Sequence, residues 1–126
     1  MILDASAVLA FLLREPGQNR VMEVLLTEPR MSTVNFAEVV TKYVLRGRAA
    51  EGERLRDELP VVFVPVDEDL ALQAALMAAV TRPLGLSLGD RICLALARRT
   101  GAPALTADRS WLDVAGTLGV TVEAIR

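Results

Sequence analysis

Histidine is absent from this chain of 126 residues, and cysteine, tryptophan and tyrosine each occur once. The lack of histidine excludes Ser-His and Cys-His catalysis, imidazole general bases and zinc sites that use histidine. Because Cys93 is the only cysteine, no intramolecular disulfide bond can form, and we expect a protein of the reducing cytoplasm. Any catalysis must therefore proceed without imidazole.

Long apolar runs are also missing, so no segment is long enough to span a bilayer. The opening MILDASAVLAFLL lacks the basic residues of a signal peptide and contains Asp4, and we expect neither a leader nor a membrane partner. Hydrophobic residues make up 52% of the chain and charged residues 24%, which is typical of a soluble globular protein. Residues 1–126 fit one domain with its own core.

Lysine is nearly absent, since Lys42 is the only one among 14 basic residues. A compositional bias explains this better than a functional choice does. The net charge of −2 argues against a protein that coats nucleic acid electrostatically. It still allows one that approaches nucleic acid through a bound cation and a local arginine patch.

Short apolar runs alternate with stretches of helical spacing along the chain. Strands are predicted at residues 1–4, 31–34, 61–64, 104–106 and 120–122. Helices are predicted at residues 5–13, 21–26, 36–45, 49–59, 70–80, 90–99 and 111–118. This alternation favours right-handed crossovers and a parallel sheet covered on both faces, which is an α/β fold built as a three-layer sandwich.

Four acidic residues follow apolar runs and precede or open predicted helices: Asp4, Glu38, Asp90 and Asp108. Ligands of such sheets bind beyond the carboxyl ends of the strands, so these carboxylates are expected to converge. Hard oxygen ligands suit Mg²⁺ or Mn²⁺, and such a cation can drive phosphodiester hydrolysis without histidine. The sequence thus predicts a metal-dependent nuclease site.

Each acid also has an ordinary explanation as a helix cap. Asn35 and Glu38 have the spacing of a capping box with Asn35 at the N-cap, and Ser87 and Asp90 repeat that spacing. Asp4 and Asp108 could be simple N-caps. The joint pattern favours a metal site, because caps need not gather at one edge. Other acids are read as solvated: the cluster 67–69, whose strand is expected at the sheet margin, and Asp113.

Four segments resemble the PIN-domain family, and within it the VapC-type toxins of bacterial and archaeal toxin-antitoxin pairs. They are ILDASA at 2–7, NFAEV at 35–39, LSLGDRICLALA at 86–97 and LTADRSW at 105–111, in the family's order and spacing. The resemblance covers essentially the whole chain. It implies a Mg²⁺- or Mn²⁺-dependent endoribonuclease with a five-stranded parallel sheet, usually dimeric and inhibited by a cognate antitoxin.

The resemblance carries metal binding onto Asp4 and Asp90 most firmly, and onto Asp108 and Glu38 as the remaining acids. Ser6 and Thr106 match small hydroxyl positions beside the first and last aspartates and are expected to support the site. The first strand is expected to be trimmed, since only three residues precede Asp4.

Two arginines adjoin the predicted ligands. Arg91 and Arg109 are candidates for contact with RNA phosphates, with a surface or carboxylate-pairing role as an equal alternative.

The sequence disfavours two competing functions and leaves two others open. A receiver domain needs a late lysine, and a nucleotide-binding module needs a glycine-rich turn after the first strand, and the chain has neither. An RNA-processing nuclease that is not a toxin and a catalytically silent interaction module of the same fold stay open. Apolar residues on the helices at 21–26, 36–45 and 49–59 exceed what a small domain must bury, so a homodimer is predicted.

Overall fold

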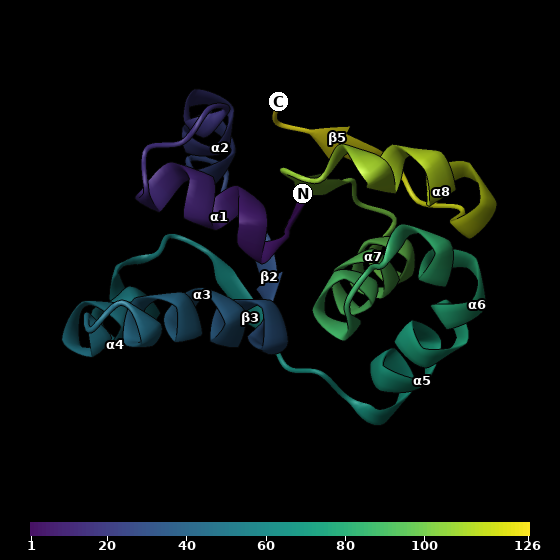
Figure 1. Ribbon diagram of the computed structural model, residues 1–126, viewed down its shortest axis with the longest axis horizontal. Helices are drawn as coiled ribbons and strands as arrows, with labels where there is room; N and C mark the ends of the chain where they lie inside the picture. Colours follow the sequence, from purple (N-terminus) through teal and green to yellow (C-terminus); the bar gives the residue numbers. More distant parts are fainter.

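Five short parallel strands form the centre of the molecule in the computed structural model, which describes residues 1–126 (Figure 1). The sheet order is β3-β2-β1-β4-β5, so β3 lies at one margin as expected. The strands are β1 (Ile2–Leu3), β2 (Arg30–Ser32), β3 (Val62–Val64), β4 (Ala104–Thr106) and β5 (Val122–Ala124). The first strand is short, as expected, with only two residues.

Helices cover both faces of this sheet. One layer contains α1 (Ala5–Leu12), α2 (Gln18–Leu25), α3 (Thr33–Leu45) and α4 (Ala49–Glu58). The other contains α5 (Glu68–Leu76), α6 (Ala78–Thr81), η1 (Arg82–Leu84), α7 (Leu88–Thr100), η2 (Arg109–Trp111) and α8 (Leu112–Leu118). In Figure 1 the first layer lies to the left and the second to the right. The predicted three-layer α/β sandwich is confirmed.

An apolar core lies on each face of the sheet, between the strands and the helices. Strand β1 contributes side chains to both cores. Ile2 is fully buried under the second layer, whereas its neighbour Leu3 is fully buried under the first. This alternation follows from the two-residue period of a strand. Each such side chain stabilises the fold by about 1.5–3 kcal/mol through burial. Trp111 is the largest fully buried side chain and anchors the second core.

The beginning of α3 differs from the sequence prediction. Residues 31–34 were expected to form a strand and Asn35 to cap the next helix, but α3 begins at Thr33 and its N-cap is Ser32. The Ser32 hydroxyl accepts the Asn35 N–H at 3.0 Å and so ends the strand early. The prediction that Asn35 is the N-cap of this helix is therefore wrong. The second capping box, between Ser87 and Asp90, is confirmed.

Three other boundaries also shift. The helix expected at 70–80 begins earlier, because Asp67 accepts the Leu70 N–H at 2.8 Å, and it is divided at Met77 into α5 and α6. Helix α2 begins at Gln18 rather than at 21, after Gly17 turns the chain with a φ of 93°. The last strand lies at 122–124 because the Val120 N–H still bonds the carbonyl of Ala115 in α8.

The lengths and polarities of the helices exclude a membrane-crossing helix.

Candidate active site

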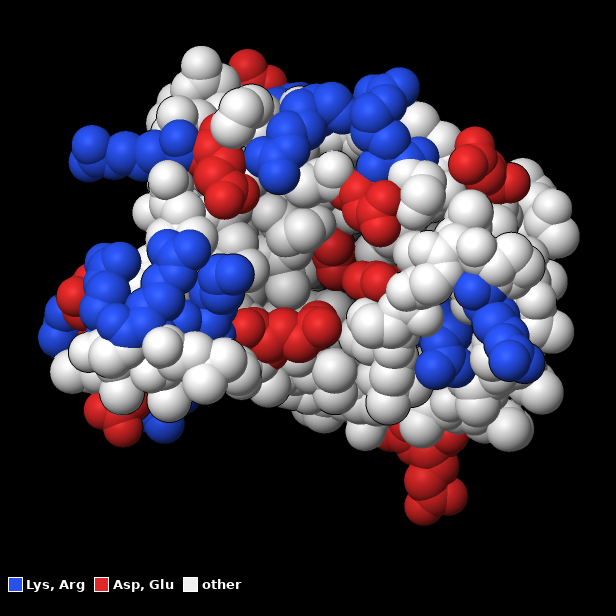
Figure 2. Space-filling view, in the orientation of Figure 1, with Lys and Arg blue, Asp and Glu red and all other residues white.

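The carboxyl ends of the central strands carry the four predicted acids. Asp4 follows β1 as the N-cap of α1, and Asp108 follows β4 as the N-cap of η2. Asp90 lies in the first turn of α7, as expected. Glu38 was expected in the first turn of its helix but lies in the second turn of α3, because that helix begins at Thr33. Acidic side chains gather around a hollow at the centre of the face shown in Figure 2, with basic side chains on its flanks. The capping roles expected for Asp4 and Asp108 are confirmed.

Asp4 is the most deeply placed of these acids, with only 2% of its surface exposed. Its Oδ2 accepts the Ser6 hydroxyl at 2.5 Å and the Thr106 hydroxyl at 3.1 Å. Its Oδ1 is buried and has no hydrogen-bond partner. Since a buried polar atom without a partner is costly, Oδ1 marks a position at which a ligand would lower the free energy.

Ser6 and Thr106 are themselves held by the backbone after β4. The Ala107 N–H donates to the Ser6 hydroxyl at 2.9 Å, and the Asp108 N–H donates to the Thr106 hydroxyl at 3.1 Å. The two hydroxyls therefore fix the orientation of the Asp4 carboxylate. This is the supporting position expected from the sequence, and it turns both hydroxyls toward Asp4.

Negative charge accumulates around Asp4. The pKa of Asp4 is raised from 3.8 to about 6. Burial is the largest cause, and the charges of Asp90 and Glu38 add to it, whereas the hydrogen bonds from Ser6 and Thr106 oppose it. Burial and the charge of Asp90 also raise the pKa of Glu38. Asp4, Glu38 and Asp90 thus interact as a group of mutually repelling carboxylates.

Glu38 is positioned by Asn35, whose role the sequence analysis missed. The fully buried Asn35 donates through Nδ2 to Glu38 Oε1 at 2.9 Å and to the Gly89 carbonyl at 3.0 Å. Its Oδ1 accepts the Ser32 hydroxyl at 2.6 Å. Asn35 therefore links α3 to the beginning of α7 and directs the Glu38 carboxylate.

The role of Gly89 beside the Glu38 carboxylate was also not predicted from the sequence. A Cβ added to Gly89 would overlap the Glu38 carboxylate, so glycine at this position leaves room for that carboxylate beside α7. The sequence did contain a signal for this role. Glycine inside a helix lowers stability by roughly 1 kcal/mol relative to alanine, so its presence there indicates a packing requirement.

Asp90 and Asp108 differ in their position. Asp90 is half-buried, and its Oδ2 accepts the Ser87 N–H at 2.8 Å. Asp108 is exposed, and its Oδ1 accepts the Ser110 N–H at 2.9 Å and the Ser110 hydroxyl at 2.7 Å. Asp90 and Glu38 lie close enough to Asp4 for their charges to raise its pKa. Asp108 is the exposed acid of the four and lies at the rim of the site.

The arrangement fits a divalent cation in its donor atoms. All candidate ligands are carboxylate oxygens, which Mg²⁺ and Mn²⁺ prefer, and Asp4 Oδ1 is an unsatisfied acceptor at the centre. No three acidic side chains lie as a group that could hold one metal ion in this structure. Mg²⁺ commonly takes one or two protein carboxylates and keeps several waters, so an open set is compatible with its binding.

The two arginines proposed for substrate binding have other contacts. Arg91 donates to the Ala74 carbonyl at 3.1 Å and so ties α7 to α5. Arg109 is exposed and donates to the backbone carbonyl of Arg126 at 3.1 Å. Only Arg109 therefore stands at the rim beside Asp108 with most of its guanidinium free.

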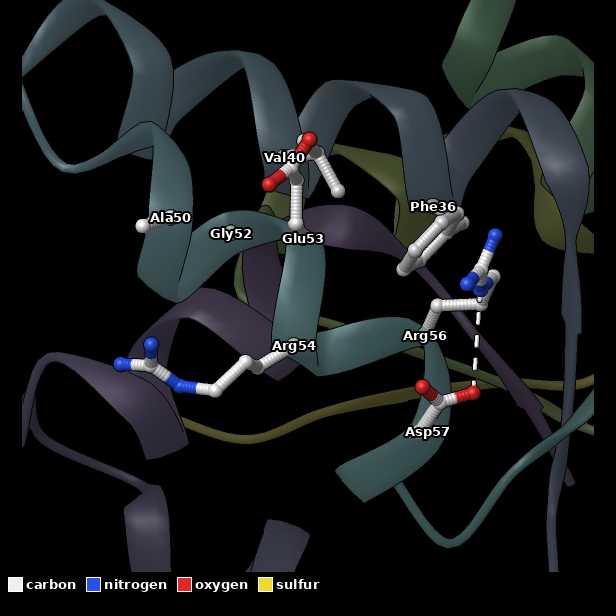
Figure 3. Close-up of a pocket in the computed structure, with 8 residues that line it drawn as sticks. All are labelled: Phe36, Val40, Ala50, Gly52, Glu53, Arg54, Arg56 and Asp57. Atoms are coloured by element: carbon white, nitrogen blue, oxygen red, sulfur yellow. Dashed lines mark ion pairs between the residues drawn. The ribbon is translucent and has the colours of Figure 1, made fainter.

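A separate groove lies between α3 and α4 (Figure 3). It is lined by Phe36, Val40, Ala50, Gly52, Glu53, Arg54, Arg56 and Asp57 and contains none of the four acids.

Comparison with known proteins identifies the family. Residues 1–117 match the PIN domain. The chain is 34% identical over 115 residues to a VapC ribonuclease of Mycobacterium bovis and to ribonuclease VapC42 of Mycobacterium tuberculosis, covering 83% of this chain and 88% of each relative.

The fold of this chain is similar to that of FitAcB from Neisseria gonorrhoeae, with a TM-score of 0.73, 20% identity and coverage of 98% and 96% of the two chains. It is also similar to DNA-bound VapBC from Salmonella typhimurium, with a TM-score of 0.74, 11% identity and coverage of 99% and 97%. A match across nearly the whole chain, together with this identity to ribonucleases, shows that the protein belongs to the PIN domain family.

Proposed function

We propose that this PIN-domain protein is a divalent-cation-dependent endoribonuclease and the toxin of a type II toxin-antitoxin pair. The proposal depends above all on Asp4, whose Oδ2 accepts hydrogen bonds from two hydroxyls while its buried Oδ1 has no partner. The charges of Asp90 and Glu38 act on the same carboxylate. The VapC ribonucleases to which the chain is similar support an RNA substrate.

Asp4, Asp90 and Glu38 would hold Mg²⁺ or Mn²⁺, and Asp108 would join from the rim, directly or through a water. When bound, such an ion polarises a phosphoryl oxygen and lowers the pKa of a bound water to near neutrality. Ser6 and Thr106 keep the Asp4 carboxylate oriented, and Asn35 directs Glu38. The assignment needs no histidine.

Substrate contacts follow from the same geometry. Arg109 is proposed to bind an RNA phosphate at the rim, because its guanidinium is exposed and makes only one hydrogen bond. Arg91 is the weaker candidate, because it is half-buried and bonded to the Ala74 carbonyl. Ser6 and Thr106 act on substrate only through Asp4.

Two protein partners are proposed, a cognate antitoxin and a second copy of the chain. An apolar groove between α1, α2 and α4 is lined by Phe11, Met22, Leu26, Leu55 and Leu59 among others, and we assign it to the antitoxin. Structures with a similar fold are of toxin-antitoxin complexes. For the homodimer, further apolar side chains remain exposed on α3 and α5, namely Val44, Leu45, Leu72 and Leu76. A monomeric mass by light scattering at micromolar concentration would contradict the dimer.

The deciding experiment is RNA cleavage by the purified protein with Mn²⁺, with Mg²⁺ and with excess chelator. Cleavage is expected with either cation and not with chelator. Asp4→Asn and Asp90→Asn are expected to abolish cleavage while circular dichroism reports an intact fold. Undiminished cleavage by both folded variants, or activity that resists the chelator, would refute the proposal.

Two alternatives make different predictions. A silent interaction module would bind no cation, whereas the proposed enzyme should gain thermal stability in millimolar Mn²⁺ and lose that gain in Asp4→Asn. An RNA-processing enzyme would cleave RNA without arresting growth. Growth arrest on induction, relieved by co-expression of a small DNA-binding partner, would support the toxin.

A further inference from the structure

One side of α3 continues from the acidic site as a row of basic residues. Lys42 and Arg46 follow Glu38 at intervals of four residues, and residues so spaced lie on one face of a helix, about 6 Å apart along its axis. Figure 2 shows basic side chains over the α3–α4 hairpin, next to the acidic groups of the central hollow. The row therefore begins at a proposed ligand of the cation and leads away from it.

Neither basic residue of this row is used by the protein itself. Both side chains are exposed, and neither takes part in any ion pair. Glu38 and Lys42 have the order and spacing that favour a helical ion pair, yet Glu38 is bonded to Asn35 instead. Lys42 is thus left free beside the site.

Half of the other basic residues take part in ion pairs. Ion pairs engage Arg20, Arg48, Arg54, Arg56, Arg99 and Arg126. In the groove of Figure 3, Arg56 lies 3.7 Å from Asp57. Arg54 lies 3.9 Å from Glu58, which is not part of the groove. Arg91 and Arg98 share α7 with Asp90, but they donate hydrogen bonds to the Ala74 carbonyl and to Gln73. Lys42 in α3 and Arg46 at its C-cap have no such side-chain partner.

We propose that Lys42 and Arg46 form a phosphate-binding ridge that receives the single-stranded RNA chain on one side of the scissile bond. Adjacent phosphates of an extended strand are separated by about the interval of these two cations. The ridge would contact the backbone and not the bases, so it contributes affinity and register rather than sequence preference. This inference rests on the proposed ribonuclease function.

The test compares Lys42→Ala, Arg46→Ala and the double variant with Arg30→Ala. Arg30 is also exposed and unpaired, but it begins β2 and so lies at the opposite edge of the sheet from the acids. Cleavage of a single-stranded RNA of about ten nucleotides is measured in Mn²⁺ at several salt concentrations. A dinucleotide with one phosphodiester bond, too short to reach the ridge, serves as the reference substrate.

Each ridge substitution is expected to raise KM for the longer RNA by roughly threefold, and the double variant by roughly tenfold, with a smaller effect on kcat. The dependence of log(kcat/KM) on log salt should become shallower by about 0.7 for each cation removed, the value for one phosphate contact in a single strand. Lys42→Arg should retain the wild-type slope. Arg30→Ala should change neither quantity, and the dinucleotide should be cleaved alike by all of these proteins.

The outcomes separate the two proposals. If the wild type cleaves RNA but the slope of the double variant equals that of Arg30→Ala, the ridge is refuted and the ribonuclease stands. If the wild type cleaves no RNA, both are refuted. Lys42 and Arg46 in the last turn could also stabilise the helix dipole. A loss of melting temperature without a change in salt slope would therefore assign them to the fold and overturn the ridge.

Discussion

Thr106 donates a hydrogen bond of 3.1 Å to Asp4, although 102 positions separate the two residues in the sequence. The bond joins the end of β4 to the beginning of α1. Together with the Ser6 hydroxyl it occupies Asp4 Oδ2 and leaves Oδ1 as the only oxygen of that carboxylate available to a ligand. The orientation of the central carboxylate therefore depends on two neutral side chains.

Removing these hydroxyls should weaken cation binding while every proposed ligand is retained. Thr106→Val keeps the shape of the side chain and deletes its donor, and Ser6→Ala deletes the other. Loss of such outer contacts typically lowers metal affinity roughly 10- to 100-fold. We expect the Mn²⁺ concentration for half-maximal RNA cleavage to rise by that factor in each variant.

Thr100→Val is the matched control for Thr106→Val. Thr100 ends α7, and its hydroxyl donates to the Leu96 carbonyl at 2.9 Å, remote from the acids in the fold. Its Mn²⁺ requirement should equal that of the wild type. If Thr106→Val and Thr100→Val behave alike, the orienting role of Thr106 is wrong.

Gly89→Ala should impair the site through a single methyl group. The new Cβ would overlap the Glu38 carboxylate, which must then leave its position beside Asn35. We expect RNA cleavage to fall by at least about tenfold, since small displacements of catalytic groups cost that much or more. Steady-state cleavage rates and thermal melting check this.

Gly116→Ala provides the control for a glycine in a helix. A Cβ at Gly116 meets nothing within 4 Å, so the substitution should raise stability by about 0.5–1 kcal/mol and leave cleavage unchanged. Wild-type cleavage by Gly89→Ala would mean that the position of Glu38 is unimportant.

The pH dependence of stability should carry the signature of Asp4. Its pKa rises from 3.8 in the unfolded chain to about 6 in the native protein, so the native state binds the proton more tightly. Stability relative to Asp4→Asn is then highest below pH 4, falls as pH rises to 6 and is constant above. The total change is on the order of 2 kcal/mol.

Urea unfolding of the wild type and of Asp4→Asn, both in chelator, measures this difference between pH 4 and pH 8. The comparison cancels the titration of other acids, such as Asp67, whose pKa is lowered by its hydrogen bonds from Leu70 and Arg99. A difference that does not vary with pH would contradict the burial of the Asp4 charge.

Asn35→Ala should cost both stability and activity. It removes the donor to Glu38 and to the Gly89 carbonyl, and it leaves the buried Ser32 hydroxyl without its acceptor. Unsatisfied buried groups cost about 1–3 kcal/mol each, so denaturant unfolding should show a loss in this range or above. The other asparagine, Asn19, is exposed in α2, and Asn19→Ala should change stability by less than about 0.5 kcal/mol. Equal losses in the two variants would refute the bridging role.

The layers of the fold could be predicted because alternation of short apolar runs with helical stretches is a property of the chain itself. The boundary between β2 and α3 at Ser32 could not be predicted from the sequence. The run 31–34 suits a strand, but Ser32 and Asn35 are both fully buried, and their mutual hydrogen bonds decide where the strand ends. Burial in the tertiary structure here outweighs the local strand propensity, and the pattern of apolar residues in the sequence does not reveal that burial.

The places of Asp4, Asp90 and Asp108 in the fold could be predicted for a similar reason, since each follows a strand or opens a helix. Glu38 lies one turn further into its helix than the pattern indicated. What the pattern lacks is the direction of each side chain. Asp108 lies at the rim because the turn at Ser110 holds its carboxylate there. Arg91 adjoins Asp90 in sequence, yet its guanidinium reaches α5, a neighbour that only the packing of helices reveals.

Asp4 caps α1, and Asp90 lies in the first turn of α7. The N-terminus of a helix carries about half a positive elementary charge, so two peptide dipoles offset part of the repulsion between these carboxylates. If these acids hold the proposed cation, its binding need not drive folding of the chain.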